Sequence, residues 1–112
     1  MMSGVDEWGK DPAVRAMRKM FKSMEDSQGE FFSRLGINGY DPHIRFWREK
    51  ALVLFEKTIS RANRAGMSIN EKTASDIYIH CLAHIMKAQG IVISETYLPE
   101  PIGIEGLLKE SF

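Results

Sequence analysis

The sequence predicts an all-α protein of three long antiparallel helices, at about residues 12–35, 42–65 and 70–89, with a partly extended C-terminal tail. In each segment, apolar residues recur at the spacing of a helix face. Each segment is followed by a glycine, which readily adopts the left-handed conformation that ends many helices. The connections are short, and short connections favour antiparallel neighbours in a helical bundle.

The first predicted helix begins at Asp11-Pro12, since aspartate suits the N-cap and proline suits the first helical position. Its apolar residues share an arc of about 120°, which continues past Gly29, so we expect one helix of about 24 residues that ends at Gly36. The arc consists of Ala13, Val14, Met17, Met20, Phe21, Met24, Phe31, Phe32 and Leu35.

Basic residues lie opposite the start of this arc, namely Arg15, Arg18, Lys19 and Lys22. Such a basic amphipathic helix could bind a membrane surface or a partner's groove. The apolar arc instead continues unbroken to Leu35, which favours a stripe that faces the core. Acidic residues also follow the basic ones at once, which counts against membrane binding.

The second predicted helix repeats the same opening at Asp41-Pro42 and ends at Gly66. Its apolar face consists of Ile44, Trp47, Ala51, Leu52, Leu54, Phe55, Ile59, Ala62 and Ala65. Together the three helices predict a core that includes Val14, Met17, Phe21, Phe31, Leu35, Trp47, Leu54, Phe55, Ile77, Cys81 and Ile85.

The third predicted helix has two candidate N-caps. Ser68 with Glu71 fits a capping box, and Asn70 fits a simple cap. Its apolar arc is about 200° wide, and one neighbouring helix cannot cover so wide an arc. Either this helix lies between the other two with the tail over it, or it pairs with a second copy of the chain.

We divide the chain into an N-terminal arm (1–10), a three-helix domain (11–90) and an acidic, apolar docking tail (91–112). Pro99 and Pro101 prevent a continuous helix in the tail. The tail carries one basic and four acidic residues, a net charge of −3, whereas residues 41–64 carry six basic and three acidic residues, a net charge of +3. We therefore expect the tail to lie across a basic helix face of its own chain or of a partner.

The whole-chain composition narrows the class of protein. The 112 residues include 15 basic and 15 acidic ones, and this neutral balance is unlike that of a dedicated nucleic-acid-binding domain. With Cys81 as its one cysteine the chain has no internal disulfide, which favours a reducing compartment and a cytoplasmic location. We see neither a signal peptide nor a transmembrane segment.

One candidate site is a set of metal ligands in the third helix. Asp76, His80 and His84 are spaced four residues apart, which places them near one side of a helix. Two imidazoles and a carboxylate can hold a divalent transition metal, and a symmetric dimer would supply four histidines. The alternative is a plain polar stripe, shared with Lys72 and Lys87.

A second candidate site is a basic stripe on the second helix. Lys50, Lys57, Arg61 and Arg64 share an arc of about 60°, bordered by Phe46 and Val53. Such residues could bind an anionic ligand or nucleic acid weakly by holding phosphates and stacking a base. The alternative is a solvated face whose charges pair with nearby glutamates.

The sequence argues against an enzyme, because it has neither a GxSxG serine motif nor a glycine-rich phosphate loop. We expect a non-enzymatic helical interaction module that forms a homodimer or docks as a small subunit on a larger protein. The alternatives are a small metal-binding protein that uses Asp76, His80 and His84, or weak anion binding at the basic stripe.

Overall fold

The computed structural model describes the backbone of residues 12–100 and the side chains of residues 18–100. It contains the helices α2 (Pro12–Arg34), α3 (His43–Arg64) and α4 (Glu71–Ala88), and a short 3-10 helix η1 (Glu95–Tyr97). The described residues contain no strand, so the predicted all-α class and its three helices are confirmed. The arm 1–10, the cap at Asp11 and the tail beyond residue 100 lie outside the described residues.

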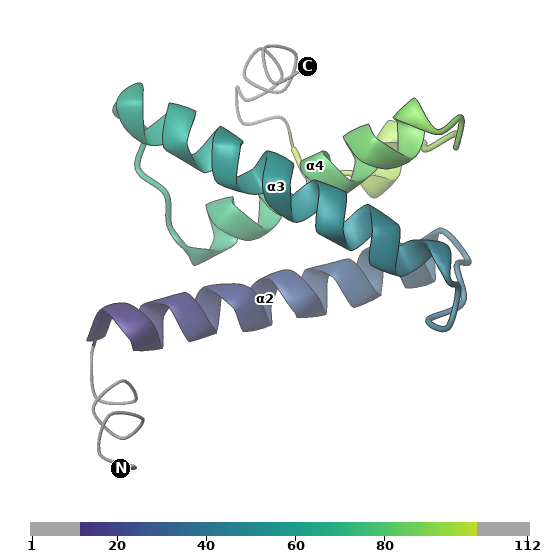
Figure 1. The fold of residues 1–112 in the computed structure, drawn as a ribbon, viewed down its shortest axis with the longest axis horizontal. Helices are drawn as coiled ribbons and strands as arrows, with labels where there is room; N and C mark the ends of the chain where they lie inside the picture. The colour runs from purple at the N-terminus through teal and green to yellow at the C-terminus, as the bar shows by residue number, and fades with distance from the viewer. Residues whose placement is uncertain (1–11, 101–112) are drawn as a thin grey trace.

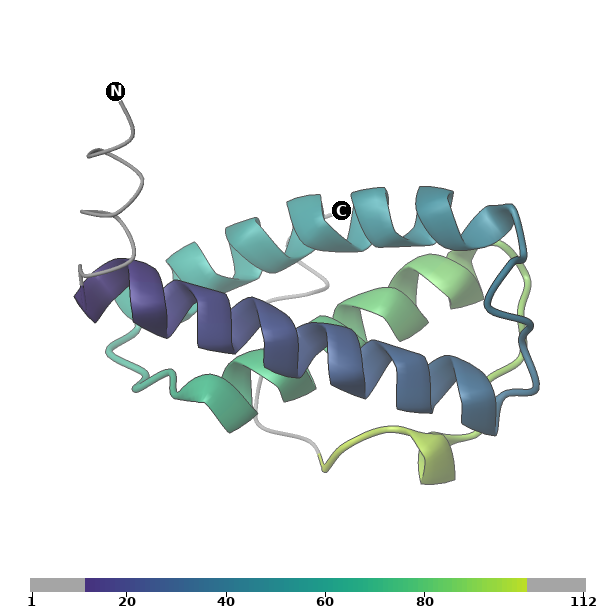
Figure 2. The ribbon, with the colours of Figure 1, turned by 90° about the horizontal axis from the view of Figure 1, so that it is seen from below.

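The three helices follow one another in alternating directions, and α2 and α3 cross at an angle (Figures 1 and 2). Helix α4 packs against both of them and is the central element of the bundle. This position covers much of the wide apolar arc of α4 within the chain, as in the first of the two arrangements expected for the third helix. After α4 the chain turns back through η1 and runs beside α4 (Figure 2).

The core agrees with the predicted one in most of its members. The confirmed core residues are Phe31, Trp47, Leu54, Phe55, Ile77, Cys81 and Ile85, and Leu35 packs against them partly buried. Phe21 was predicted to be buried but is 48% exposed. The helical period places Phe21 on the correct face of α2, but α3 crosses α2 at an angle and leaves it uncovered. The side chains of Val14 and Met17 lie outside the described residues.

All three helices end in the same hydrogen-bonded turn. Gly36, Gly66 and Gly90 have positive φ angles of 73°, 79° and 86°, as predicted for left-handed C-terminal residues. The amide that follows each glycine donates to the carbonyl five residues earlier, at 2.9–3.1 Å, which is the Schellman pattern. The residue that follows each glycine is apolar and packs against the core; these residues are Ile37, Met67 and Ile91.

The helix starts follow local capping chemistry. The Asn70 side chain accepts a hydrogen bond from the Thr73 amide at 2.8 Å, so Asn70, and not Ser68, is the N-cap of α4. Helix α3 begins at His43, one residue later than predicted, and Pro42 is its N-cap. Asp41 still satisfies a free amide, because its carboxylate accepts from the His43 N–H at 2.8 Å.

Candidate functional site

The predicted metal ligands lie on α4, and each has a different environment. The Asp76 carboxylate is bound to the Lys72 ammonium group at 2.9 Å. His80 is buried, and its Nε2 atom has no hydrogen-bond partner. Burial and the charge of Lys87 lower the pKa of His84. Among residues 18–100, no group of three or more His, Cys, Asp or Glu side chains is placed to hold a metal ion. Metal binding therefore stays a prediction.

A hollow of about 320 Å³ lies between α2, the start of α4 and the segment after η1. Four of its charged side chains form the ion pairs Glu30–Arg34 and Lys72–Asp76, and Glu100 also lines it. The hydrogen bond and the charge of Asp76 raise the pKa of Lys72, with a smaller contribution from Glu100. Glu100 thus acts on a lysine of α4, and the predicted contacts of the tail beyond it fall outside the described residues.

The basic stripe of α3 divides into two parts. Lys57, Arg61 and Arg64 line a shallow hollow of about 410 Å³ together with Ser60 and Glu56. Lys50 lies about 10 Å further along the helix axis. Its ammonium group sits 5.7 Å from the centre of the Phe46 ring. The structure therefore brings three of the four predicted residues together and places the fourth over an aromatic ring.

A third surface, which the sequence did not reveal, lies where α2 and α3 cross. We call it the seam. One hollow of about 140 Å³ has apolar walls from Phe21, Met24 and Leu52, with Tyr78 of α4 beside them. An adjacent hollow of about 370 Å³ includes Phe32, Ile37 and Ile44. The two hollows share Gln28 and Arg48 in their linings, so they lie side by side.

The seam is polar at its base and at its rim. The buried Tyr78 hydroxyl donates a hydrogen bond to the Gln28 side-chain oxygen. Burial raises the pKa of Tyr78 to about 12, although the nearby Arg48 opposes this rise. Arg48 also faces Glu25 across the two helices at 3.9 Å. Helical periodicity assigns these residues to faces, but only the crossing angle of α2 and α3 brings them together.

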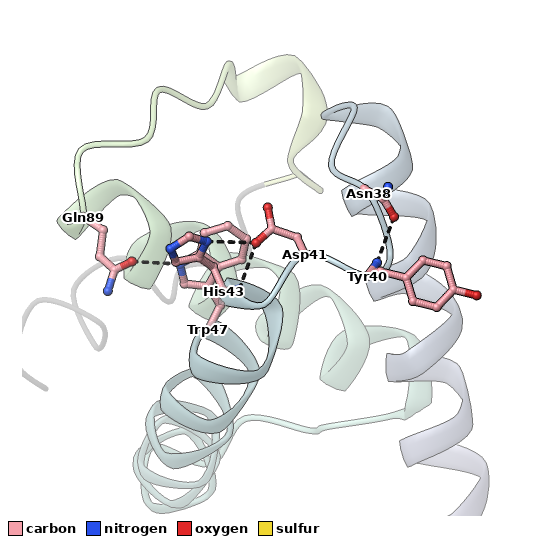
Figure 3. Close-up of polar contacts among 6 residues, drawn as sticks. All are labelled: Asn38, Tyr40, Asp41, His43, Trp47 and Gln89. Atoms are coloured by element: carbon pink, nitrogen blue, oxygen red, sulfur yellow. Dashed lines mark hydrogen bonds and ion pairs between the residues drawn. The ribbon is translucent and has the colours of Figure 1, made fainter.

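A cluster that the sequence also did not reveal joins the start of α3 to the end of α4 (Figure 3). The Asp41 carboxylate lies 2.9 Å from Nδ1 of His43, and because an ionised carboxylate only accepts, Nδ1–H donates. The hydrogen bond from the His43 amide is the main reason that the pKa of Asp41 is lowered. The His43 ring stacks on Trp47, with centres 5.7 Å apart, and Trp47 donates to Gln89 at 2.9 Å.

An Asp–His pair can orient an imidazole for general base catalysis. In the described part of the chain, however, the one polar side chain bound to the His43 ring is Asp41, and no hydroxyl or thiol is bound to it. The cluster therefore accounts for how the ends of α3 and α4 are held together, and it assigns no reaction.

No protein-family model matches the chain, and comparisons with curated proteins and with solved structures give no match. No helix within the described residues is both long enough and apolar enough to cross a membrane.

Proposed function

We propose that the chain is a non-enzymatic helical interaction module that forms a homodimer through the seam. The observation that carries this proposal is the half-exposed Phe21 beside an apolar hollow. A large aromatic side chain next to a hollow lined by Met24 and Leu52 is typical of a helix-binding groove.

The seam favours a second copy as the partner because it has both an exposed apolar side chain and a hollow that could receive the same side chain of another copy. A two-fold symmetric interface joins the same surface of two subunits, so each projection must meet a hollow on that surface. Phe21 is the projection, and the 140 Å³ hollow beside it is the recess. Glu25 and Arg48 lie at the same place with opposite charges, so each can pair with its counterpart across the two-fold axis.

The wide apolar arc of α4 no longer supports a dimer. Eleven of its eighteen residues are buried within one chain, including all of its isoleucines. The exposed large apolar residues instead include Phe21 on α2 and Phe46 and Val53 on α3. The seam combines such an exposed residue with a hollow, so we place the interface there.

The test is the molar mass in solution of three proteins, measured by sedimentation equilibrium. We expect the wild type to be a dimer and Phe21→Glu to be a monomer, because the dimer would have to bury the glutamate carboxylate away from water, which is unfavourable. Val53→Glu is the matched control, since Val53 is similarly exposed at 53% but lies on the other flank of α3, and it should stay dimeric. Circular dichroism confirms that each variant is folded. A monomeric wild type, or equal effects of the two changes, would reject the seam as a dimer interface.

A metal-binding function is the second candidate, and the buried His80 favours it. A buried nitrogen without a hydrogen-bond partner is costly, and a metal ion would supply the missing interaction. Elemental analysis of the isolated protein, and calorimetric titration with Zn²⁺, would test it. We expect heat from the wild type and none from His80→Ala. The absence of heat in both proteins would exclude Asp76, His80 and His84 as a zinc site.

A further inference from the structure

The flank of α3 that faces away from the seam combines positive charge with exposed apolar groups. Phe46 and Val53 are 42% and 53% exposed. The cations are those of the basic stripe, of which Lys50, Lys57 and Arg64 are exposed. All these residues lie within an arc of about 80° and extend over about 27 Å of the helix. In a chain of zero net charge this is a local basic surface.

Apolar and basic groups alternate over the first part of this flank, in the order Phe46, Lys50, Val53 and Lys57, and two more basic residues, Arg61 and Arg64, follow. The core-facing residues of α3 lie on another side of the helix, so Phe46 and Val53 project outward, and the shallow hollow beside Lys57, Arg61 and Arg64 lies further along the flank. A folded protein partner would need hollows to receive Phe46 and Val53, whereas lipid headgroups rearrange around projecting side chains. Lysine and arginine stems are long enough to reach lipid phosphates while shorter apolar groups enter the interface.

Single-stranded nucleic acid fits this flank less well. Stacking of a base requires an open aromatic face. The Lys50 ammonium group already lies over one face of the Phe46 ring, at 5.7 Å from its centre. Val53 offers nothing that a base or a phosphate would recognise, whereas a bilayer interface accepts it.

We propose that this flank of α3 binds the surface of an anionic lipid bilayer, with the basic stripe against the lipid phosphates and with Phe46 and Val53 in the interfacial layer. The helix lies on the bilayer and does not cross it. The surface is separate from the seam, so this proposal does not depend on the homodimer.

The experiment is co-sedimentation of the full chain with vesicles of phosphatidylcholine containing about one-third phosphatidylserine. We expect binding that weakens as salt is added, and no binding to vesicles of phosphatidylcholine alone. The double variant Lys50→Glu/Lys57→Glu should bind about tenfold less or weaker still. The matched control is Lys19→Glu/Lys22→Glu, which makes the same change in net charge at exposed positions of α2, and it should bind within about twofold of the wild type.

Two results would overturn the proposal. If both double variants lose binding equally, the attraction depends on overall charge and not on this flank. If the wild type does not bind the anionic vesicles but binds a single-stranded RNA, and Lys50→Glu/Lys57→Glu does not bind that RNA, the flank is a nucleic-acid surface. The variant Phe46→Ser/Val53→Ser adds a separate readout, because it keeps every charge. This variant should reduce the vesicle binding that persists at high salt. Unchanged binding would show that Phe46 and Val53 do not contact the bilayer.

Discussion

Helices α3 and α4 are both amphipathic in sequence, but the fold uses them differently. Eleven of the eighteen residues of α4 are buried, whereas only six of the twenty-two residues of α3 are. Helix α4 lies between two neighbours, and α3 lies at the surface with one flank at the seam and the other at the basic stripe. Substitutions in α4 should therefore change stability, and substitutions on the flanks of α3 should change binding.

The largest expected effect is at the centre of α4. Ile77 is fully buried, so Ile77→Ala should lower the free energy of unfolding by about 2–5 kcal/mol through lost burial and an unfilled cavity. Val53→Ala on α3 should change it by less than about 0.5 kcal/mol, because the side chain is exposed. Urea unfolding followed by circular dichroism measures both. Similar losses in the two variants would contradict the contrast between the helices.

The second effect is a loss of stability at alkaline pH. Burial raises the pKa of Cys81 and of Tyr78, each to about 12, from their ordinary values of 9.0 and 10.0. Between these values and pH 12 the unfolded chain loses protons that the folded chain keeps. Stability is therefore fully present below pH 9 and falls as the pH rises toward 12, by at most about 1.4 kcal/mol per pH unit for each group.

Urea unfolding at several pH values between 8 and about 11.5 checks this slope. Tyr78→Phe should make the curve less steep above pH 10, and Cys81→Ala should do so from pH 9, whatever their effects at neutral pH. A curve with the wild-type slope in both variants would show that neither group causes the alkaline loss.

A smaller effect is expected at the start of α4. Asn70→Ala removes the oxygen that accepts the Thr73 N–H and should cost about 1 kcal/mol. Ser68→Ala serves as the control, because Ser68 lies before the cap and is exposed. The midpoint of thermal unfolding distinguishes the two variants. A larger loss from Ser68→Ala would favour the capping box over the simple cap.

The last effect concerns the contact that joins α3 and α4, and it is measured as a coupling energy because Trp47 is buried and its replacement also costs packing. Trp47→Phe keeps an aromatic ring beside His43 but removes the N–H that donates to Gln89. A part-buried hydrogen bond between neutral groups contributes about 0.5–1.5 kcal/mol. Thermal unfolding of Trp47→Phe, Gln89→Ala and the double variant would measure the coupling of the two residues. Losses that simply add would show that the bond does not contribute.

The helices and their ends were predictable because their signals are local. A left-handed glycine and an N-cap side chain each act within a few residues, so Gly36, Gly66 and Gly90 marked the helix ends correctly. Even so, Ser68 and Asn70 could not be separated by sequence, since either side chain is chemically able to accept the bond. The geometry of the chain before α4 chose Asn70.

The candidate sites were less predictable because they depend on distant residues. Spacing placed Asp76, His80 and His84 on one side of α4, but it could not show that Lys72 binds Asp76 or that His80 is buried. The hydrogen bond between Tyr78 and Gln28 joins residues fifty positions apart. No local pattern contains such a contact.

The amino-acid sequence by itself determined the all-α class, the three helices and the apolar face of each, because these follow from helical period and capping chemistry. Only the tertiary structure decided that α4 is central, that Phe21 is half exposed and that α2 and α3 form a seam. The physical reason is that the crossing angle of two helices is set by the simultaneous packing of many side chains from both helices and their neighbours. Periodicity assigns a residue to a face, and packing decides whether another helix covers it.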